Sequence, residues 1–322
     1  MTSSLAAGTR TRMDVRDQVA RLGVWVALVA ILLVGILAVP NFGTGANADA
    51  ILRQAAVLGV VALGQTFVIL TGGIDLSVGM LMGLVTVLAN GIMAGDPGLI
   101  VPVVLVALAC GLLTGIANGL GVVVARVDPL IVTLAMLSVL QGLIFLYTDR
   151  TVGSAPEAFR RLAYGSLGPL PVPALLLGVL AVICWVVLTR TPFGRYVYAL
   201  GSDAPNARRA GIAIDRVRVA AYVVCSLLAS IAGLLLAARL GSGFTGAGAG
   251  FELSSIVAVV VGGTALSGGR GGVPGTIAAV FLLTMLATLL NLLGISPFAQ
   301  RVINGVVIVV AVAVYTARRR DA

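Results

Sequence analysis

The sequence contains no histidine and no lysine, and only 10% of its 322 residues are charged. Without histidine, the chain cannot form imidazole zinc sites or the Ser-His and Cys-His pairs of nucleophilic enzymes. Without lysine, it has no Walker A loop, because that motif ends in Gly-Lys-Ser or Gly-Lys-Thr. We therefore expect no enzymatic activity in this chain, no ATP hydrolysis of its own, no metal and no organic cofactor.

The shortage of charge is matched by an excess of apolar residues, which make up 59% of the chain and give a mean hydropathy of +1.12. Soluble domains carry about 25% charged residues, which this chain does not have. Inside a bilayer no water satisfies the backbone, so a spanning chain must form helices or a closed barrel. The long apolar runs predict an all-α, polytopic membrane protein.

The formal net charge is +9, and all 21 basic residues are arginines. In a soluble domain this charge would suggest a nucleic-acid partner. In a membrane protein it fits cytoplasmic loops held beside anionic lipid, so we expect a lipid bilayer and no nucleic acid as partner. The three cysteines, Cys110, Cys184 and Cys225, lie in apolar runs and are expected to be small buried side chains.

About ten segments are apolar and long enough to cross roughly 30 Å of hydrocarbon. They comprise residues 21–39, 51–71, 76–94, 98–121, 129–147, 170–189, 217–239, 252–267, 273–293 and 299–316. The segment 76–94 is interrupted by glycine and asparagine, and 252–267 is short, so either is a candidate for a broken or re-entrant helix. In the fourth segment Gly111, Gly115 and Gly119 recur at four-residue spacing, which predicts a close helix–helix contact.

The distribution of arginine predicts how these segments are oriented. With a cytoplasmic N-terminus, fifteen arginines lie in internal segments and six in external ones, which favours N- and C-termini that are both cytoplasmic. The chain then divides into an N-terminal tail (1–20), a transmembrane domain (21–316) and a C-terminal tail (317–322), with a long external loop (148–169) and a long internal loop (190–216). The first apolar run exceeds the about 7–15 residues of a signal-peptide core, so we interpret it as a retained helix.

The internal loop contains the signals of a short helix. Asp203 and Pro205 resemble a helix start, and Gly211 resembles its C-terminal cap, which predicts a helix over 205–211. Asp215 could cap the helix that follows. Such a bracketed helix is a rigid protrusion. It fits either a protein-docking element or an amphipathic surface helix whose arginine pair contacts lipid phosphates.

A glycine pair, Gly72 and Gly73, predicts a break between the second and third segments. Asp75 and Ser77 are placed to cap the third helix. An ionisable residue near a broken intramembrane helix is a functional candidate, although Asp75 could also be a simple cap at the cytoplasmic surface. A second glycine-rich stretch, 262–275, lacks lysine and a preceding strand, so it predicts a tight turn rather than a phosphate site.

Uncharged polar residues are scattered through the apolar segments. Gln65, Thr66, Asn90 and Asn118 are the candidates for a translocation path, or alternatively for polar contacts that hold helices together. A lining of uncharged polar groups suits a neutral, hydroxyl-rich solute. Proton-coupled pumps usually need membrane-buried Asp, Glu or His, which are nearly absent here.

Three stretches of the chain resemble the bacterial ribose-type ABC transporter permeases, the membrane subunits of monosaccharide importers. The first is GQTFVILTGGIDLSVG, whose signature residues are Gly72, Gly73, Asp75 and Ser77. The second runs from Ala199 to Gly243 and the third from Glu252 to Tyr315. Together they cover most of residues 50–316, in the order and at the spacing of the family.

The resemblance implies a ten-helix permease of the bacterial inner membrane that works as a pair, with a second copy or a paralogue. Its implied partners are an ABC ATPase subunit, often with two fused cassettes, and an extracytoplasmic sugar-binding protein that delivers the substrate. ATP hydrolysis would then be the work of the partner chain, in agreement with the missing Walker motif.

The resemblance also gives the internal loop a role, since the short helix of the family's loop docks in a groove on the ATPase. The family has an acidic-Ala-Ala pattern followed by Gly-Ile, and this chain has Ala-Pro-Asn at the first three positions, directly after Asp203. The implied coupling residues are Gly201, Asp203, Asn206, Ala207, Arg208, Arg209, Gly211 and Ile212.

Three alternatives remain at this point. A related ABC permease could carry a branched-chain amino acid or a nucleoside instead of a monosaccharide or polyol. A self-sufficient secondary transporter would need no ATPase, but the absence of buried carboxylate relays and the bracketed internal helix speak against it. An intramembrane enzyme is disfavoured, since the chain has no histidine and no G-x-S-x-G motif.

Overall fold

The computed structural model describes residues 11–296 and the single positions 299, 302 and 305. Residues 1–10 and the predicted tail 317–322 lie outside this part of the chain, as does the predicted span 299–316 apart from those three positions. Helices dominate the described chain, and its one sheet is a hairpin of two-residue strands. The all-α prediction is confirmed.

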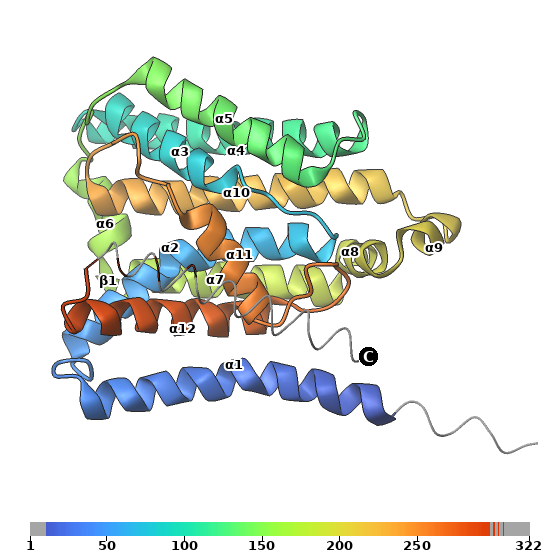
Figure 1. Ribbon diagram of the computed structural model, residues 1–322. Coiled ribbons are helices and arrows are strands. Elements are labelled where there is room, and N and C mark those ends of the chain that lie inside the picture. Colours follow the sequence, from blue (N-terminus) through green and yellow to red (C-terminus); the bar gives the residue numbers. More distant parts are fainter. Residues whose placement is uncertain (1–10, 297–298, 300–301, 303–304, 306–322) are drawn as a thin grey trace, which may run out of the picture.

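The described elements follow one another in a simple order along the chain (Figure 1). They are α1 (Thr11–Ala38), α2 (Gly45–Leu70), α3 (Val78–Met93), the 3-10 turn η1 (Pro97–Leu99), α4 (Ile100–Val123), α5 (Pro129–Tyr147), α6 (Glu157–Tyr164), β1 (Ser166–Leu167), β2 (Leu170–Pro171), α7 (Val172–Arg190), α8 (Pro192–Ser202), α9 (Ala204–Arg209), α10 (Ile214–Leu240), α11 (Phe251–Val261) and α12 (Val273–Leu292).

Six of the described helices are long and apolar enough to cross a membrane, judged by length and composition: α2, α4 with its preceding turn, α5, α7, α10 and α12. Three shorter apolar helices, within α1, α3 and α11, fall on further predicted segments. With 11 residues, α11 is about 16 Å long at ~1.5 Å per residue, half of the hydrocarbon thickness. It is the short helix that 252–267 suggested, and it ends earlier, at Val261, where the chain turns at Gly263 with φ +86°.

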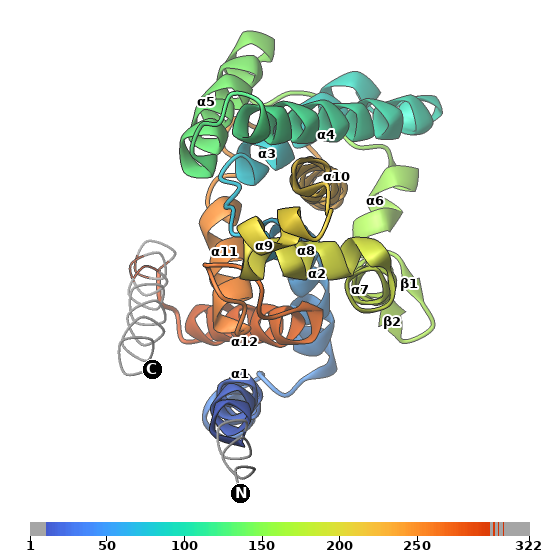
Figure 2. The same ribbon diagram turned by 90° about the vertical axis from the view of Figure 1, so that its right-hand side faces the viewer.

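The helices lie roughly side by side, and α2 and α10 form the interior of the bundle. In the view along the helices, α10 lies between α4 and the α2–α8 region, and α1 lies on the outside against α12 (Figure 2). Most side chains of α2 and α10 are buried. By contrast α4, α5 and α7 expose apolar side chains such as Leu105, Leu146 and Val179, as expected of surfaces that face lipid or a partner subunit.

The glycines of α4 allow α10 to approach closely. A Cβ added at Gly115 would lie 2.5 Å from the Cα of Val223, and one added at Gly119 would lie 2.8 Å from the Cα of Val219. Gly111 meets the same helix one turn further on, at the Ser226 carbonyl oxygen. The predicted small-residue contact is confirmed, and its partner is α10.

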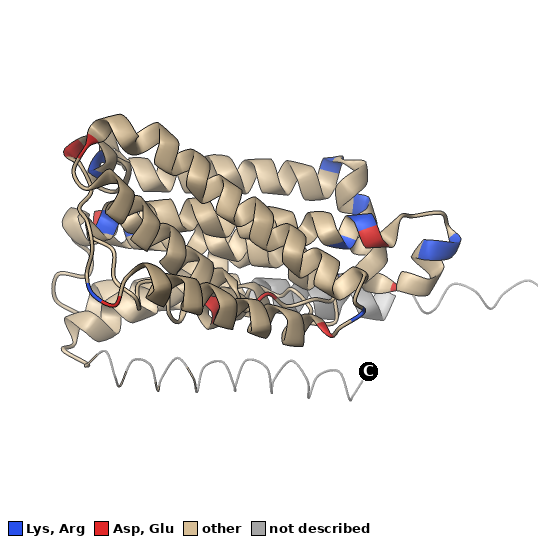
Figure 3. Ribbon diagram, turned by 90° about the horizontal axis from the view of Figure 1, so that it is seen from above, with Lys and Arg blue, Asp and Glu red and all other residues tan. Residues whose placement is uncertain are grey.

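Most charged residues lie towards the two ends of the bundle, and only a few acidic residues lie between them (Figure 3). One end carries α8, α9 and the beginning of α1, and the opposite end carries α6 and the β1–β2 hairpin (Figure 1). The predicted loops 190–216 and 148–169 are therefore at opposite ends. Arg53 of α2 holds the second loop in place, since its guanidinium contacts Asp49 at 2.6 Å and the Ala163 carbonyl oxygen at 2.7 Å.

Candidate functional site

The internal loop forms two short helices in succession, and both are capped by side chains. Thr191 Oγ1 accepts a hydrogen bond from the Gly194 amide at 3.3 Å and begins α8. Asp203 begins α9, because its carboxylate accepts from the backbone amide of Asn206 at 3.0 Å and from the Asn206 side chain at 2.7 Å. The predicted acidic cap is confirmed, and the helix predicted over 205–211 occupies Ala204–Arg209.

The chain leaves α9 through a tight turn at Gly211, whose φ of +80° lies in the left-handed region that suits glycine. The Gly211 amide bonds to the Arg208 carbonyl oxygen at 3.0 Å, and Ile212 bonds to Ala207 at 3.1 Å. Asp215 does not cap α10 as expected, since the N-cap position is Ala213. It lies in the first turn of α10 and forms an exposed ion pair with Arg208 at 3.3 Å, which links α9 to the following helix.

The outward face of α9 is exposed and polar. Asn206, Arg208 and Arg209 are exposed, whereas Ala207 is buried against the rest of the chain. Arg209 also donates to the Asn206 side chain at 3.3 Å. Because both ends of α9 are tied down, this helix is a rigid protrusion at one end of the bundle, beyond α8 (Figure 1).

Gly201 of α8 packs directly on the end of α2. A Cβ added at Gly201 would overlap both the Leu70 carbonyl oxygen and the Gly269 amide nitrogen. That amide donates to the same Leu70 oxygen at 3.0 Å, and Gly268 lies beside it. We call this contact the glycine junction, made by Gly201, Gly268 and Gly269 around the Leu70 carbonyl. It links the internal helices to α2 and to the glycine-rich turn before α12.

Directly beyond this junction the chain is not helical. α2 ends at Leu70, and α3 begins only at Val78, so the break predicted at the glycine pair is confirmed. Gly72 has a φ of +79°, and a Cβ at Gly73 would lie 2.6 Å from the Tyr222 hydroxyl of α10. The backbone can therefore pass close to α10 only because these positions lack side chains.

Asp75 lies in this non-helical segment and is fully buried. Its Oδ1 accepts hydrogen bonds from the Ser77 amide at 2.9 Å and from the Ser77 hydroxyl at 2.6 Å. The N-cap of α3 is Ser77, without a side-chain hydrogen bond to the helix. Asp75 is thus neither the helix cap nor the surface residue that the sequence allowed, but part of a buried turn before the helix.

Side chains from two long helices complete a polar cluster around this carboxylate. Asn118 of α4 donates to the Ser77 hydroxyl at 2.9 Å and to Asp75 at 3.4 Å. Gln65 of α2, with its amide oriented to match these groups, accepts from the Asp75 backbone nitrogen at 3.1 Å and donates to its carbonyl at 3.3 Å. We call Gln65, Asp75, Ser77 and Asn118 the Asp75 cluster. In the described part of the chain no arginine forms an ion pair with Asp75.

The other two path candidates lie elsewhere in the bundle. Thr66 bonds to the Ala62 carbonyl at 2.8 Å and lies 3.1 Å from the Thr276 hydroxyl of α12. Asn90 donates to the Thr86 carbonyl at 3.0 Å and to the Ala237 carbonyl of α10 at 3.4 Å. Like Gln65 and Asn118 they are fully buried, so all four candidates connect separate segments of the bundle in this conformation.

Several residues at these sites were not singled out by the sequence. Thr133 of α5 donates to the Ile74 carbonyl at 3.3 Å and so supports the non-helical segment from a further helix. Tyr222 is fully buried next to Gly73, and its hydroxyl has no partner among the described residues. The single tyrosine within an apolar segment was the sequence signal that could have identified Tyr222, because a buried tyrosine hydroxyl usually has a hydrogen-bond partner.

Comparison with known proteins gives matches over nearly the whole chain. Residues 47–312 match the family model of the branched-chain amino acid transport system permease component. The chain is 40% identical to the ribose import permease of Bacillus subtilis strain 168, over 91% of each chain. It is also 40% identical to the ribose import permease of Escherichia coli K12, over 89% of this chain and 90% of that protein.

A third relative is the L-arabinose transport system permease of Escherichia coli K12, at 33% identity over 90% of this chain and 88% of that protein. No solved structure gives a significant match. The chain belongs to the family of bacterial ABC transporter permeases that includes the ribose and L-arabinose import permeases.

Proposed function

We propose that this chain is the membrane subunit of an ATP-driven importer of a monosaccharide or a related polyol. The observation that carries this proposal is the 40% identity to a ribose import permease over 91% of both chains. The apolar helices make the chain a multi-pass protein of the bacterial inner membrane. Uncharged polar groups, with few titratable ones, suit a neutral hydroxylated solute better than an ion.

The proposed assembly contains two permeases, an ABC ATPase and an extracytoplasmic sugar-binding protein. The missing Walker A motif supports a separate ATPase, which we expect to carry two fused cassettes. The arginine distribution supports cytoplasmic N- and C-termini with an even number of crossings, and the apolar segments of the sequence support about ten. With that orientation α9 projects into the cytoplasm, and α6 with the β1–β2 hairpin faces the binding protein.

The proposed mechanism is alternating access driven through α9. Its exposed residues, among them Asn206, Arg208 and Arg209, dock on the ATPase, and closure of the ATPase draws the two permeases together at this end. The glycine junction then transmits the movement of α8 to the end of α2 and to the turn before α12. In this scheme the polar residues Gln65, Thr66, Asn90 and Asn118 exchange their contacts as the pathway between the permeases opens to the other side.

The family model's description also supports a second substrate class, branched-chain amino acids. An amino acid carries both a carboxylate and an ammonium group, so its binding sites usually offer charged or strongly polar partners. Among the buried polar residues of the described chain only Asp75 is ionisable to a charged group, which favours the sugar.

Affinity purification of the tagged chain from its native membranes, followed by mass spectrometry, tests the proposal. We expect an ATPase with two Walker A motifs to be recovered, together with a secreted solute-binding protein. The binding protein is then screened against pentoses, hexoses, inositol, nucleosides and branched-chain amino acids. Recovery of the chain alone, active in vesicles without ATP, would instead establish a secondary transporter.

A further inference from the structure

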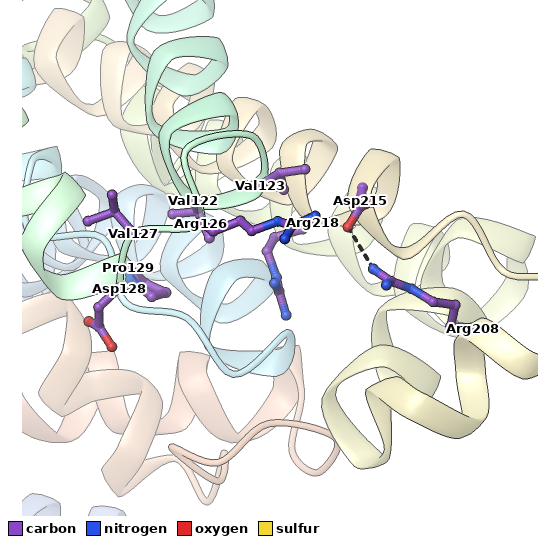
Figure 4. A pocket seen from close by; sticks show the side chains of 9 residues that line it. All are labelled: Val122, Val123, Arg126, Val127, Asp128, Pro129, Arg208, Asp215 and Arg218. Atoms are coloured by element: carbon purple, nitrogen blue, oxygen red, sulfur yellow. Dashed lines mark hydrogen bonds and ion pairs between the residues drawn. The ribbon is translucent and has the colours of Figure 1, made fainter.

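A cavity of about 660 Å³ opens at the end of the bundle that carries α9, between the α4–α5 turn and the start of α10 (Figure 4). Three arginines line it: Arg126 in the turn, Arg208 at the end of α9 and Arg218 on α10. Two acidic residues, Asp128 and Asp215, line it as well. Arg208 is also one of the proposed coupling residues, whereas Arg126 and Arg218 belong neither to the coupling residues nor to the Asp75 cluster.

The two carboxylates of the cavity already have partners. Asp215 pairs with Arg208 at 3.3 Å, and Asp128 accepts a hydrogen bond from the Leu130 amide at 2.8 Å at the beginning of α5. Within the described chain, Arg126 and Arg218 form no ion pair. Three guanidinium groups therefore face two carboxylates in one cavity, and two of the three have no ion-pair partner in the described chain, an excess of positive charge that favours the binding of an anion.

The backbone at Arg126 supports a specific role for its side chain. Its φ of +56° lies in the left-handed region, where glycine or asparagine usually ends a helix. A non-glycine residue kept in such a conformation is often found at a functional site. A glycine would satisfy the turn but would supply no guanidinium to the cavity.

The position of the cavity identifies the source of the anion. The candidate spans flanking the turn end at Val123 and begin at Pro129, so the cavity lies where the bundle leaves the hydrocarbon. Its remaining lining is apolar, formed by Val122, Val123, Val127 and Pro129. Beside it, Leu120, Val124 and Ile131 are 45%, 72% and 59% exposed. Charge at the boundary beside an apolar surface is the pattern that accommodates a lipid headgroup and its chains.

We propose that this cavity binds the phosphate headgroup of an anionic phospholipid, with Arg126 and Arg218 as its guanidinium donors. The acyl chains lie along the exposed apolar side chains of α4 and α5. An acidic side chain of a partner protein would contact only the two guanidinium groups. The apolar wall, which continues onto the exposed surface of both helices, matches the acyl chains of a lipid and would stay uncovered by a single acidic side chain.

Native mass spectrometry of the detergent-purified chain tests this site, with dioleoylphosphatidylglycerol titrated against dioleoylphosphatidylcholine. We expect preferential binding of the phosphatidylglycerol, and a loss of about fivefold in its affinity for each of Arg126→Gly and Arg218→Gln. Arg190→Gln is the matched control, because Arg190 is an exposed arginine at the end of α7, at the same end of the bundle but outside the cavity.

Arg126→Gly suits the left-handed backbone, and Arg218→Gln leaves the turn unaltered, so a melting temperature for each separates loss of binding from loss of fold. Equal binding of the two lipids, or unchanged phosphatidylglycerol binding in both variants, overturns the proposal. Displacement of the lipid by millimolar inorganic phosphate would mark a phosphate site without a lipid requirement and also overturns it. Weakened ATPase binding with unchanged lipid binding would assign the arginines to an acidic partner surface instead.

Discussion

The backbone amide of Gly269 donates a hydrogen bond of 3.0 Å to the carbonyl oxygen of Leu70, the last residue of α2. Gly201 of α8 covers the same oxygen so closely that no side chain fits there. Three segments far apart in the sequence therefore meet at one backbone atom. Since the segment after Leu70 leads directly to Asp75, the proposed mechanism has a movement of α8 act on the Asp75 cluster through this junction.

The first prediction concerns the close approach at Gly201. In Gly201→Ala the new methyl group overlaps the Leu70 carbonyl, so α8 must move away from α2. We expect the free energy of unfolding to fall by about 1–3 kcal/mol, the usual cost of overpacking, and sugar uptake to fall further than the amount of folded protein. Thermal unfolding in detergent and uptake into proteoliposomes with the ATPase measure the two effects.

Gly178→Ala in α7 is the matched control, because an added Cβ there meets nothing within 4 Å. It should leave both stability and uptake unchanged. If Gly201→Ala loses stability but its folded fraction transports normally, the junction holds the fold and does not transmit movement.

The second prediction concerns the Asp75 cluster. Asp75→Ala removes the acceptor for the Ser77 amide and hydroxyl and leaves Asn118 with one partner fewer. Each buried donor left unpaired costs about 1–3 kcal/mol, so we expect a large fall in melting temperature and little folded protein. Asp75→Asn keeps an acceptor oxygen and should be milder, which isolates the contribution of the negative charge.

Ser138→Ala on the exposed side of α5 is the control, since its hydroxyl bonds only to its own helix at Leu134. If Asp75→Ala has the same melting temperature as the parent chain, the Asp75 cluster does not stabilise the non-helical segment between α2 and α3. Its hydrogen bonds would then contribute little to stability.

The third prediction concerns the docking of α9. Arg208→Gln breaks only an exposed ion pair with Asp215, which contributes about 0–1 kcal/mol, so the permease should remain folded. If the guanidinium also contacts the ATPase, uptake should fall several-fold while ATP hydrolysis by the assembled complex continues. Both rates are measured on the same reconstituted sample.

Asp215→Asn breaks the same ion pair without removing the arginine, and Arg195→Gln removes an exposed arginine from α8. We expect normal coupling in both. Loss of coupling in Asp215→Asn as well would mean that the ion pair positions α9, and that Arg208 itself does not touch the ATPase.

Local signals in the sequence were sufficient for several parts of the candidate site. The glycine pair at Gly72 and Gly73 predicts the break after α2, and the acidic residue Asp203 predicts the cap of α9. These features depend on a few neighbouring residues and on backbone conformation. A single sequence contains that information directly.

The convergence of distant residues could not be predicted in the same way. Asn118 bonds to Asp75 from 43 positions away in the sequence. The apolar sequence of α4 does not indicate which face of that helix packs against the segment between α2 and α3. Asp75 was equally compatible with a surface cap, because burial depends on the packing of the surrounding helices. Arg126 was not suspected either, since its left-handed backbone lacks the glycine that usually marks such a position.

The last prediction concerns the contact between α4, which contributes Asn118 to the Asp75 cluster, and α10, which contributes Arg218 to the cavity. A valine at Gly115 would place its Cβ 2.5 Å from the Cα of Val223. The Cβ is fixed to the backbone of α4 and the Cα belongs to the backbone of α10, so the clash is relieved only if the two helices move apart. We expect Gly115→Val to lower the free energy of unfolding by about 1–3 kcal/mol or more. Thermal unfolding measures this loss.

The displacement should also reach the polar groups nearby, because Asn118 is on the next turn of α4 and Tyr222 precedes Val223 on α10. In Gly115→Val, uptake per folded molecule should therefore fall with stability. Gly142→Ala on α5, where an added Cβ meets nothing within 4 Å, should have neither effect. Retained uptake in a destabilised Gly115→Val protein would show that the spacing of α4 and α10 supports the fold alone, and that the Asp75 cluster tolerates their separation.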